Sequence, residues 1–305
     1  MKRLDFVIVG TFKSATSSLA LKMQSHNEVN IPHPKDPYFF LRDYCLDLKE
    51  PEDFLSVHHG ASRYEEEEFE NSFMEKSSPC MRYGEATPLY LYRYREAIEN
   101  IRDNNPEMKI VVVLRNPADR AYSNFMHNFK DGYEKSSFRD AVAEYVSREK
   151  EGLHPFFHYV KAGFYFRQVK AYMESFSQVF ILTYEDFVVS PNEILSQLCE
   201  FLNLPPFSKE EDLLQLNKTG MIKNKILHDF LLKESKVKSV VRPIYRFVFR
   251  SEDRRRRIAE SIKNKNMKKV DLEFDVRTVL NDLYRDDVIA TSNLIGRPLK
   301  ELWGM

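Results

Sequence analysis

Three short apolar runs along the chain have the pattern of buried strands. They cover residues 5–10, 110–114 and 179–183, and each leads into a turn or a polar segment. The runs are continuous, whereas a strand with one solvated face would alternate between apolar and polar residues. A continuous run is typical of a strand covered on both faces, as in a parallel sheet. These runs therefore predict the core strands of the protein.

Helical spacing fills the intervals between these runs. Residues 17–23 place Leu19 and Met23 on one face, and residues 118–129 and 193–204 also show apolar positions at helical spacing. Strands that alternate with helices predict an α/β fold, here a single domain with a mostly parallel central sheet flanked by helices. The apolar face of the last segment consists of Ile194, Leu195, Leu198, Phe201 and Leu202.

Two stretches depart from this pattern. Residues 41–82 and 205–270 are polar and irregular, with two prolines and one glycine in the first and the basic run 254–257 in the second. The alternating charges of the second stretch favour an ordinary charged helix over a polyanion-binding surface. We expect both stretches to be insertions on the acceptor side of one domain that spans residues 1–305.

Composition narrows the function classes. The 305 residues are 43% hydrophobic, which is enough for a full core, and 46 basic residues balance 46 acidic residues. A neutral chain has no overall field that attracts nucleic acid. The three cysteines have no metal-ligand spacing, and no apolar run approaches the ~18 residues needed to span a bilayer. We expect a cytoplasmic protein that needs no metal, membrane or nucleic acid, and the sequence leaves the oligomeric state open.

The turn after the first apolar run has the chemistry of an anion site. One glycine, one lysine and several hydroxyls separate this run from the following helix. Such a turn directs backbone N–H groups and the positive end of a helix toward one point, which suits phosphate or sulfate. The order Gly-x4-Gly-Lys-Ser/Thr of a Walker A loop is absent. The candidate residues are Lys13, Ser14, Ala15, Thr16, Ser17 and Ser18.

A second anion element follows the apolar run 110–114. Arg115 falls where this predicted strand ends, Asn116-Pro117 suits the start of a helix, and Ser123 lies about two turns into that helix. Ligands of open α/β sheets bind beyond the carboxyl ends of the strands. We therefore expect Arg115 and Ser123 to share one crevice with the first turn.

Together, the two segments resemble the sulfotransferases that use 3′-phosphoadenosine 5′-phosphosulfate (PAPS), in particular bacterial and heparan-type members. The resemblance implies a fold like that of the P-loop kinases. It also implies that the turn from Lys13 to Ser18 holds the 5′-phosphosulfate, whereas Arg115 and Ser123 hold the 3′-phosphate. A looser match assigns Gly220 and Lys223 to a basic loop over that phosphate. Ala15 stands where the family commonly has glycine, and we expect its φ to stay negative.

The resemblance also suggests a general base. Residues 34–40 are similar to a Lys-Glu-x-x-Phe-Phe segment of the family and place Asp36 at the position of the acid. Residues 83–90 resemble a second segment, in which Glu85 would lie beside the acceptor. Asp36 could instead be a turn residue between prolines, and Glu85 a structural partner of an arginine. A histidine, such as His127 on the face of Ser123, is a third possibility.

The resulting hypothesis is a metal-free transfer of a sulfuryl group from PAPS to a hydroxyl or amine of a small-molecule acceptor, with a bacterial natural product as the favoured class. The run 65–68 of four glutamates would suit a cationic acceptor. The alternatives are a carbohydrate sulfotransferase, a kinase-like nucleotide-binding enzyme and a non-catalytic binding module. The kinase alternative is disfavoured because a Walker A loop is absent.

Overall fold

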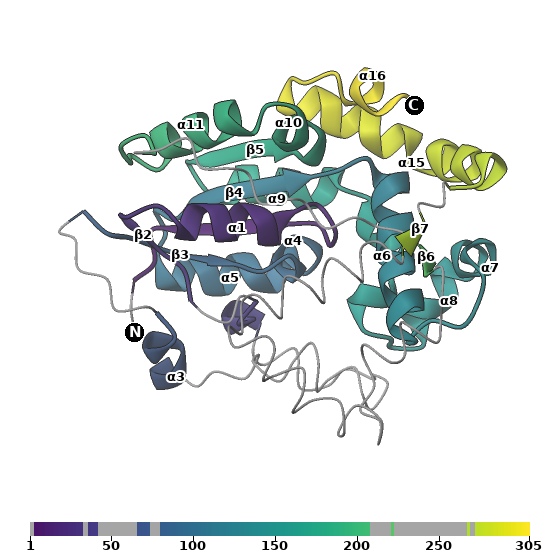
Figure 1. The fold of residues 1–305 in the computed structure, drawn as a ribbon, viewed down its shortest axis with the longest axis horizontal. Helices are drawn as coiled ribbons and strands as arrows, with labels where there is room; N and C mark the ends of the chain where they lie inside the picture. The colour runs from purple at the N-terminus through teal and green to yellow at the C-terminus, as the bar shows by residue number, and fades with distance from the viewer. Residues whose placement is uncertain are drawn as a thin grey trace, which may run out of the picture.

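A computed structural model describes residues 3–32, 36–41, 66–73, 80–207, 221–222, 267–268 and 272–305. Within these residues a central sheet lies between layers of helices (Figure 1). The predicted α/β architecture is confirmed. The predicted insertions at 41–82 and 205–270 fall largely outside the described residues.

The main sheet has five parallel strands in the order β2-β3-β1-β4-β5. All three strands predicted from apolar runs are present, and the sequence pattern did not single out β2 or β3 as core strands. The strands are β1 (Phe6–Gly10), β2 (Val29–Asn30), β3 (Arg82–Ala86), β4 (Lys109–Leu114) and β5 (Val179–Thr183).

The pairing of β1 with β4 determines where a ligand can bind. The two strands pair in register from Phe6 opposite Lys109 to Gly10 opposite Val113, so their carboxyl ends lie at the same level. From β1 the chain continues to β2 and β3 on one side, whereas from β4 it continues to β5 on the other side. The direction of winding therefore reverses between β1 and β4. In open α/β sheets such a switch point opens a crevice for ligands.

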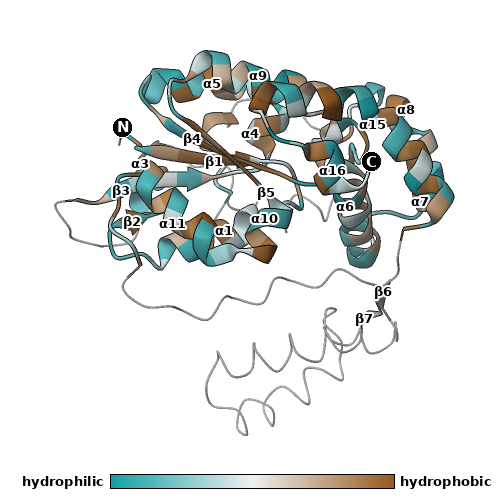
Figure 2. Ribbon diagram, turned by 90° about the horizontal axis from the view of Figure 1, so that it is seen from above, coloured by the Kyte–Doolittle hydropathy of each residue, from teal (hydrophilic) through white to brown (hydrophobic). Residues whose placement is uncertain are grey.

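Each face of the sheet packs against its own set of helices. Val7, Val9 and Val112 belong to one core cluster, whereas Ile8 and Val111 belong to the other. This alternation explains why the strands are apolar at every position, because both faces are buried. Figure 2 shows the apolar strands between the two helical layers.

The helices on one face are α1 (Thr16–Gln24), α10 (Tyr184–Val189) and α11 (Pro191–Phe201). The other face is covered mainly by α4 (Leu89–Tyr92), α5 (Tyr94–Asn104), α9 (Phe166–Ser175) and α15 (Phe274–Ile295). The three helices predicted from the sequence correspond to α1, α11 and α6 (Pro117–Asp131), which follows β4.

Short elements complete the described chain. The helices are α3 (Glu66–Asn71), α7 (Phe138–Ala143), α8 (Tyr145–Lys150) and α16 (Leu299–Trp303), and the 3-10 turns are η1 (Phe39–Leu41), η3 (Pro155–Phe157) and η4 (Lys161–Gly163). Two further strands, β6 (Met221–Ile222) and β7 (Met267–Lys268), pair antiparallel. No helix in the described part of the chain, including the 22-residue α15, is long and apolar enough to cross a membrane.

Candidate functional site

The first corner of the site is the turn from β1 into α1. A Cβ on Gly10 would lie 2.6 Å from Thr16 Cγ2 and 3.0 Å from the carbonyl oxygen of Val113, so only glycine allows this close approach. The next residue anchors the turn on both sides. The Thr11 N–H donates to the Val113 carbonyl at 3.2 Å, and its hydroxyl donates to the Ala162 carbonyl at 3.2 Å.

Left-handed backbone shapes this turn. The φ of Lys13 is 68° and that of Ala15 is 70°, so the expectation of a negative φ at Ala15 was wrong. The reason lies in the bonding of the turn, because Ser14 donates both its hydroxyl (2.6 Å) and its N–H (3.2 Å) to the Thr11 carbonyl. This compact loop leaves the chain in the left-handed region at the residue before α1.

The hydroxyls of the turn have different environments. Ser14 is fully buried and Thr16 nearly so, whereas Ser17 is exposed and Ser18 is half-buried. Ala15 provides no side-chain cap for α1, and the first N–H groups of any α-helix have no partner inside the helix. The end of α1 with its exposed hydroxyls can therefore receive an anion.

The second corner is Arg115, at the end of β4, and it contacts the first corner directly. Its Nη1 donates to the Lys13 carbonyl oxygen at 2.7 Å, although the two residues are 102 positions apart. The guanidinium lies over the Tyr184 ring, 4.3 Å from its centroid. The Tyr165 hydroxyl donates to the Arg115 carbonyl at 2.9 Å. The structure thus brings Lys13 and Arg115 together at the switch point.

The residues after Arg115 are anchored by the end of the chain. Asn116 caps α6 by accepting from the N–H groups of Ala118 (3.0 Å) and Asp119 (3.1 Å). Its Nδ2 donates to the Trp303 carbonyl at 2.9 Å. The Glu185 carboxylate accepts from the Asn116 N–H and from the Trp303 indole N–H, both at 3.0 Å. One carboxylate therefore holds both the turn and the last helix.

Helix α6 carries the other predicted phosphate ligand, Ser123, which is 2% exposed. One turn further on, His127 Nδ1 lies 2.9 Å from Asp131 Oδ2. Burial lowers the pKa of His127, the hydrogen bond to Asp131 opposes this shift, and the charge of Lys13 adds to it. His127 is therefore neutral near pH 7 and lies within electrostatic range of Lys13.

The two candidate acids differ in environment. Asp36 is half-buried and has a φ of 64°. Glu85 is fully buried at the end of β3, where Oε1 accepts from the hydroxyls of Thr87 (2.8 Å) and Tyr90. Tyr90 in turn accepts from the N–H of Phe40 at 3.0 Å. Glu85 and Tyr90 thus support the η1 segment that follows Asp36.

Burial, together with the Glu85 carboxylate, raises the pKa of Tyr90 well above its ordinary value. Tyr90 therefore stays protonated and keeps donating to Glu85. The predicted loop residues Gly220 and Lys223 lie outside the described residues. Their roles remain predictions.

Sequence reasoning missed three residues of this site. Tyr184 and Glu185 directly follow β5, the neighbour of β4, and Trp303 lies almost at the end of the sequence. The placement of Tyr184 and Glu185 at a strand end beside Arg115 was the available signal. The contact of Trp303 has no local signal, because it depends on how α15 packs.

A parallel sheet with two polar corners at its switch point is typical of folds that bind nucleotides. Residues 97–225 match the sulfotransferase domain family. The chain is also similar to a crystal structure of a sulfotransferase from Alicyclobacillus acidocaldarius, with a TM-score of 0.74, 25% identity and full coverage of both chains. The predicted resemblance to the sulfotransferases and the predicted fold are confirmed.

A curated relative is more distant. Carbohydrate sulfotransferase 15 of Rattus norvegicus is 22% identical over 253 residues, which are 68% of this chain and 45% of that protein. The chain thus spans less than half the length of this relative. The family match at 97–225 includes Arg115, Ser123 and Glu185, whereas Lys13 and Asp36 precede it.

The substitution Ala15→Gly tests whether the left-handed backbone conformation at Ala15 is strained. We expect this change to increase the free energy of unfolding by about 0.5–1 kcal/mol, because glycine adopts positive φ without the steric cost of a Cβ. Ala20→Gly in the middle of α1 is the matched control and should lower it by about 1 kcal/mol or more. Chemical denaturation measures both changes, and a loss of stability in Ala15→Gly would contradict the strain.

The Glu185 anchor predicts a loss of stability. Glu185→Ala leaves two donors without their acceptor and should lower the free energy of unfolding by about 1–3 kcal/mol. Trp303→Phe removes the indole donor and also part of a buried ring, so we expect a loss of similar size. Glu200→Ala, an exposed position on α11, should stay within about 0.5 kcal/mol of the unmodified protein. Equal stability of Glu185→Ala and Glu200→Ala in urea would disprove the anchor.

Proposed function

We propose that this sulfotransferase takes its sulfuryl group from PAPS and transfers it to a hydroxyl or amine of a small-molecule acceptor. The observation that carries the proposal is the hydrogen bond from Arg115 to the Lys13 carbonyl. It joins two cationic corners at the switch point of the sheet. A donor with anionic groups at both ends of its nucleotide requires two such corners within one crevice.

The proposed 5′ site is the turn from Lys13 to Ser18. The first N–H groups of α1 and the hydroxyls of Ser17 and Ser18 would bind phosphate oxygens, as helix N-termini do. Ser14 would contribute to the shape of the turn, because its hydroxyl is bound to Thr11. The Lys13 ammonium would neutralise the charge that develops where the sulfuryl group is released.

The proposed 3′ site consists of Arg115 and Ser123, with Gly220 and Lys223 added from the family resemblance alone. Arg115 Nε is buried and has no hydrogen-bond partner within the described residues, so it can donate to an anionic ligand. Its guanidinium is fixed by Lys13 and Tyr184, so little side-chain entropy is lost on binding. A 3′-phosphate here would also distinguish this donor from the nucleotides of kinases.

We propose Asp36 as the base that accepts the proton of the acceptor. Its half-buried side chain is partly accessible to solvent, and the family resemblance is what suggests its position beside the acceptor. Neutral His127, near Lys13, is the second candidate because it can also accept a proton. Glu85 is better suited to a positioning role, since Oε1 already accepts two hydrogen bonds in a fully buried environment.

Neutral overall charge supports a small natural product over an anionic polysaccharide, because polyanion binding calls for a basic surface. The curated relative is named a carbohydrate sulfotransferase, which makes a glycan acceptor the second candidate. We further propose that the chain is one domain and acts in the cytoplasm.

The donor site predicts a selective loss of affinity. Arg115→Ala should weaken the binding of adenosine 3′,5′-bisphosphate by about 10- to 100-fold, because a charge-assisted contact is lost, and should leave the binding of AMP nearly unchanged. Isothermal titration with both nucleotides measures the difference. Arg139→Ala, a change at an exposed arginine on α7, is the control. An equal loss for both nucleotides would refute a 3′-phosphate contact, and a protein that binds neither nucleotide would refute the donor assignment.

If the protein transfers a sulfuryl group, loss of the base should lower turnover without lowering the affinity for the nucleotide. Incubation with PAPS and a panel of hydroxyl and amine acceptors should give products heavier by one SO3 in mass spectrometry. Asp36→Asn should lower kcat by about 10²–10⁴-fold, because a positioned base is lost, with little change in nucleotide affinity. His127→Gln tests the second candidate in the same assay. Full activity of Asp36→Asn would exclude Asp36 as the base, and a chain that binds the nucleotide but sulfates nothing would favour a binding module.

A further inference from the structure

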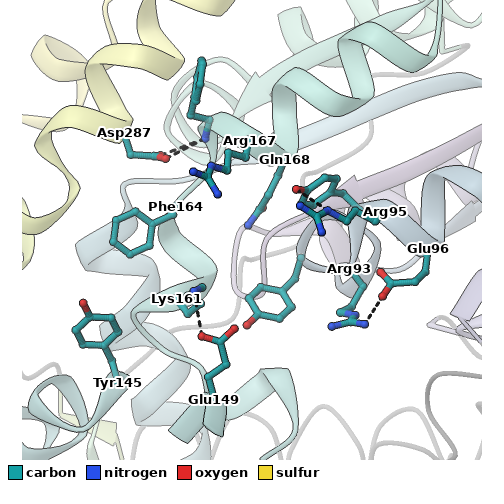
Figure 3. A pocket seen from close by; sticks show the side chains of 13 residues that line it. Arg93, Arg95, Glu96, Tyr145, Glu149, Lys161, Phe164, Arg167, Gln168 and Asp287 are labelled. Atoms are coloured by element: carbon teal, nitrogen blue, oxygen red, sulfur yellow. Dashed lines mark hydrogen bonds and ion pairs between the residues drawn. The ribbon is translucent and has the colours of Figure 1, made fainter. Parts of the chain in front are cut away.

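A cavity of about 770 Å³ lies away from the donor corners. It opens between the junction of α4 and α5, the helix α8, the η4 turn, the start of α9 and the helix α15 (Figure 3). Within the described residues, none of Lys13, Asp36, Arg115 and Ser123 lines it. The proposed sulfuryl transfer therefore leaves this cavity without a role.

The charges of the cavity wall are unbalanced. Four basic and three acidic side chains line it. Arg93 pairs with Glu96, and Lys161 Nζ lies 3.0 Å from Glu149 Oε2. The remaining lining charges are Arg95, Arg167 and Asp287.

Asp287 is engaged by the backbone. Its carboxylate accepts from the N–H of Tyr165 at 2.6 Å and from the N–H of Phe166 at 3.2 Å, at the start of α9. Burial raises the pKa of Asp287, although these hydrogen bonds and the charge of Arg167 oppose the shift. The carboxylate thus caps a helix and attracts Arg167 electrostatically, but within the described residues it forms no ion pair with Arg95 or Arg167.

The polar groups that remain suit an anion. Arg95 donates to the Tyr94 hydroxyl at 3.2 Å and has no carboxylate partner in the described part of the chain. Arg167 makes no hydrogen bond and no ion pair within the described part of the chain. Its side chain points toward the cavity in Figure 3. Gln168 also lines the cavity and is only 7% exposed. An amide in a cavity wall can hydrogen-bond a ligand or a water.

Aromatic rings form much of the remaining wall. Tyr92, Tyr145, Phe164 and Phe166 contribute rings between the charged groups. A cavity of this size is large enough for a small molecule, and its rings alternate with charged groups that could fix the orientation of a polar ligand. Guanidinium groups match the planar geometry of carboxylates and related oxyanions.

We propose that this cavity binds a small organic anion with an aromatic body. Its charged head would contact Arg95 and Arg167, its oxygen would accept from the Gln168 amide, and its rings would pack against Phe164 and Phe166. The site is separate from the donor crevice.

The wall of the cavity is also connected to both donor corners. The segment that carries Lys161 and Phe166 also carries Ala162, whose carbonyl accepts from Thr11, and Tyr165, whose hydroxyl donates to Arg115. A ligand that orders this segment is positioned to change donor affinity, and by linkage the donor would change the affinity of the ligand equally. This second step rests on the proposed donor function.

The test uses 2-naphthoate as the probe and isothermal titration of the full chain. We expect saturable binding to the unmodified protein at concentrations up to the millimolar range. Arg167→Glu should weaken it by about tenfold or more, because a charge-assisted contact is replaced by repulsion. Gln168→Leu, which keeps the volume of the side chain, should also weaken it. Lys170→Glu makes the same charge change at an exposed position of α9 that does not line the cavity, although Lys170 lies over the Phe166 ring, and it should weaken binding much less than Arg167→Glu does.

Titration with adenosine 3′,5′-bisphosphate separates the two sites. Arg167→Glu should bind this nucleotide, which shows that the variant is folded and that the donor crevice is intact. Absence of naphthoate binding, equal losses in Arg167→Glu and Lys170→Glu, or competitive displacement of naphthoate by the nucleotide would each overturn the proposal. Naphthoate binding that depends on Arg167 in a protein that does not bind the nucleotide would support the cavity site and refute only the donor assignment.

Discussion

The site depends on the register in which β1 pairs with β4, because this register brings the carboxyl ends of both strands to the same level. Because both strands end at the same edge, the turn after β1 and the residue after β4 start side by side. Arg115 then needs only its own side chain to reach the Lys13 carbonyl. The positive φ of Lys13 belongs to the loop conformation in which this contact forms. A slip of the strand register would move Arg115 away from the turn and flip the buried faces of both strands.

Arg115 itself is held by segments from three other parts of the chain. Tyr165 binds its carbonyl, Tyr184 stacks against its guanidinium, and Glu185 holds the next residue together with Trp303. A charged side chain in a partly buried position keeps one geometry only when its neighbours leave no alternative. The last helix of the chain is thus part of the site, although it lies far from it in sequence.

The predictable parts of the protein are those with local causes. The strands β1, β4 and β5 and the helices α1 and α6 follow from apolar runs and from cap residues such as Asn116. Strand β3 contains Arg82 and Glu85 and lacks such a run, and its Gly84 leaves space for the ring of Phe6. The left-handed Ala15 was also unpredictable, since alanine has no preference for this conformation and the hydrogen bonds of Ser14 shape the turn.

The two acids show how structure separates residues that look equivalent in sequence. Each follows the pattern of a family segment, yet Glu85 is bound inside the protein by Thr87 and Tyr90. Tyr90 extends this contact to the backbone of Phe40, four residues beyond Asp36. One acid thus fixes the segment that presents the other. The proposed base Asp36 would benefit from such a support, because proton transfer depends on hydrogen-bond distance before it depends on pKa.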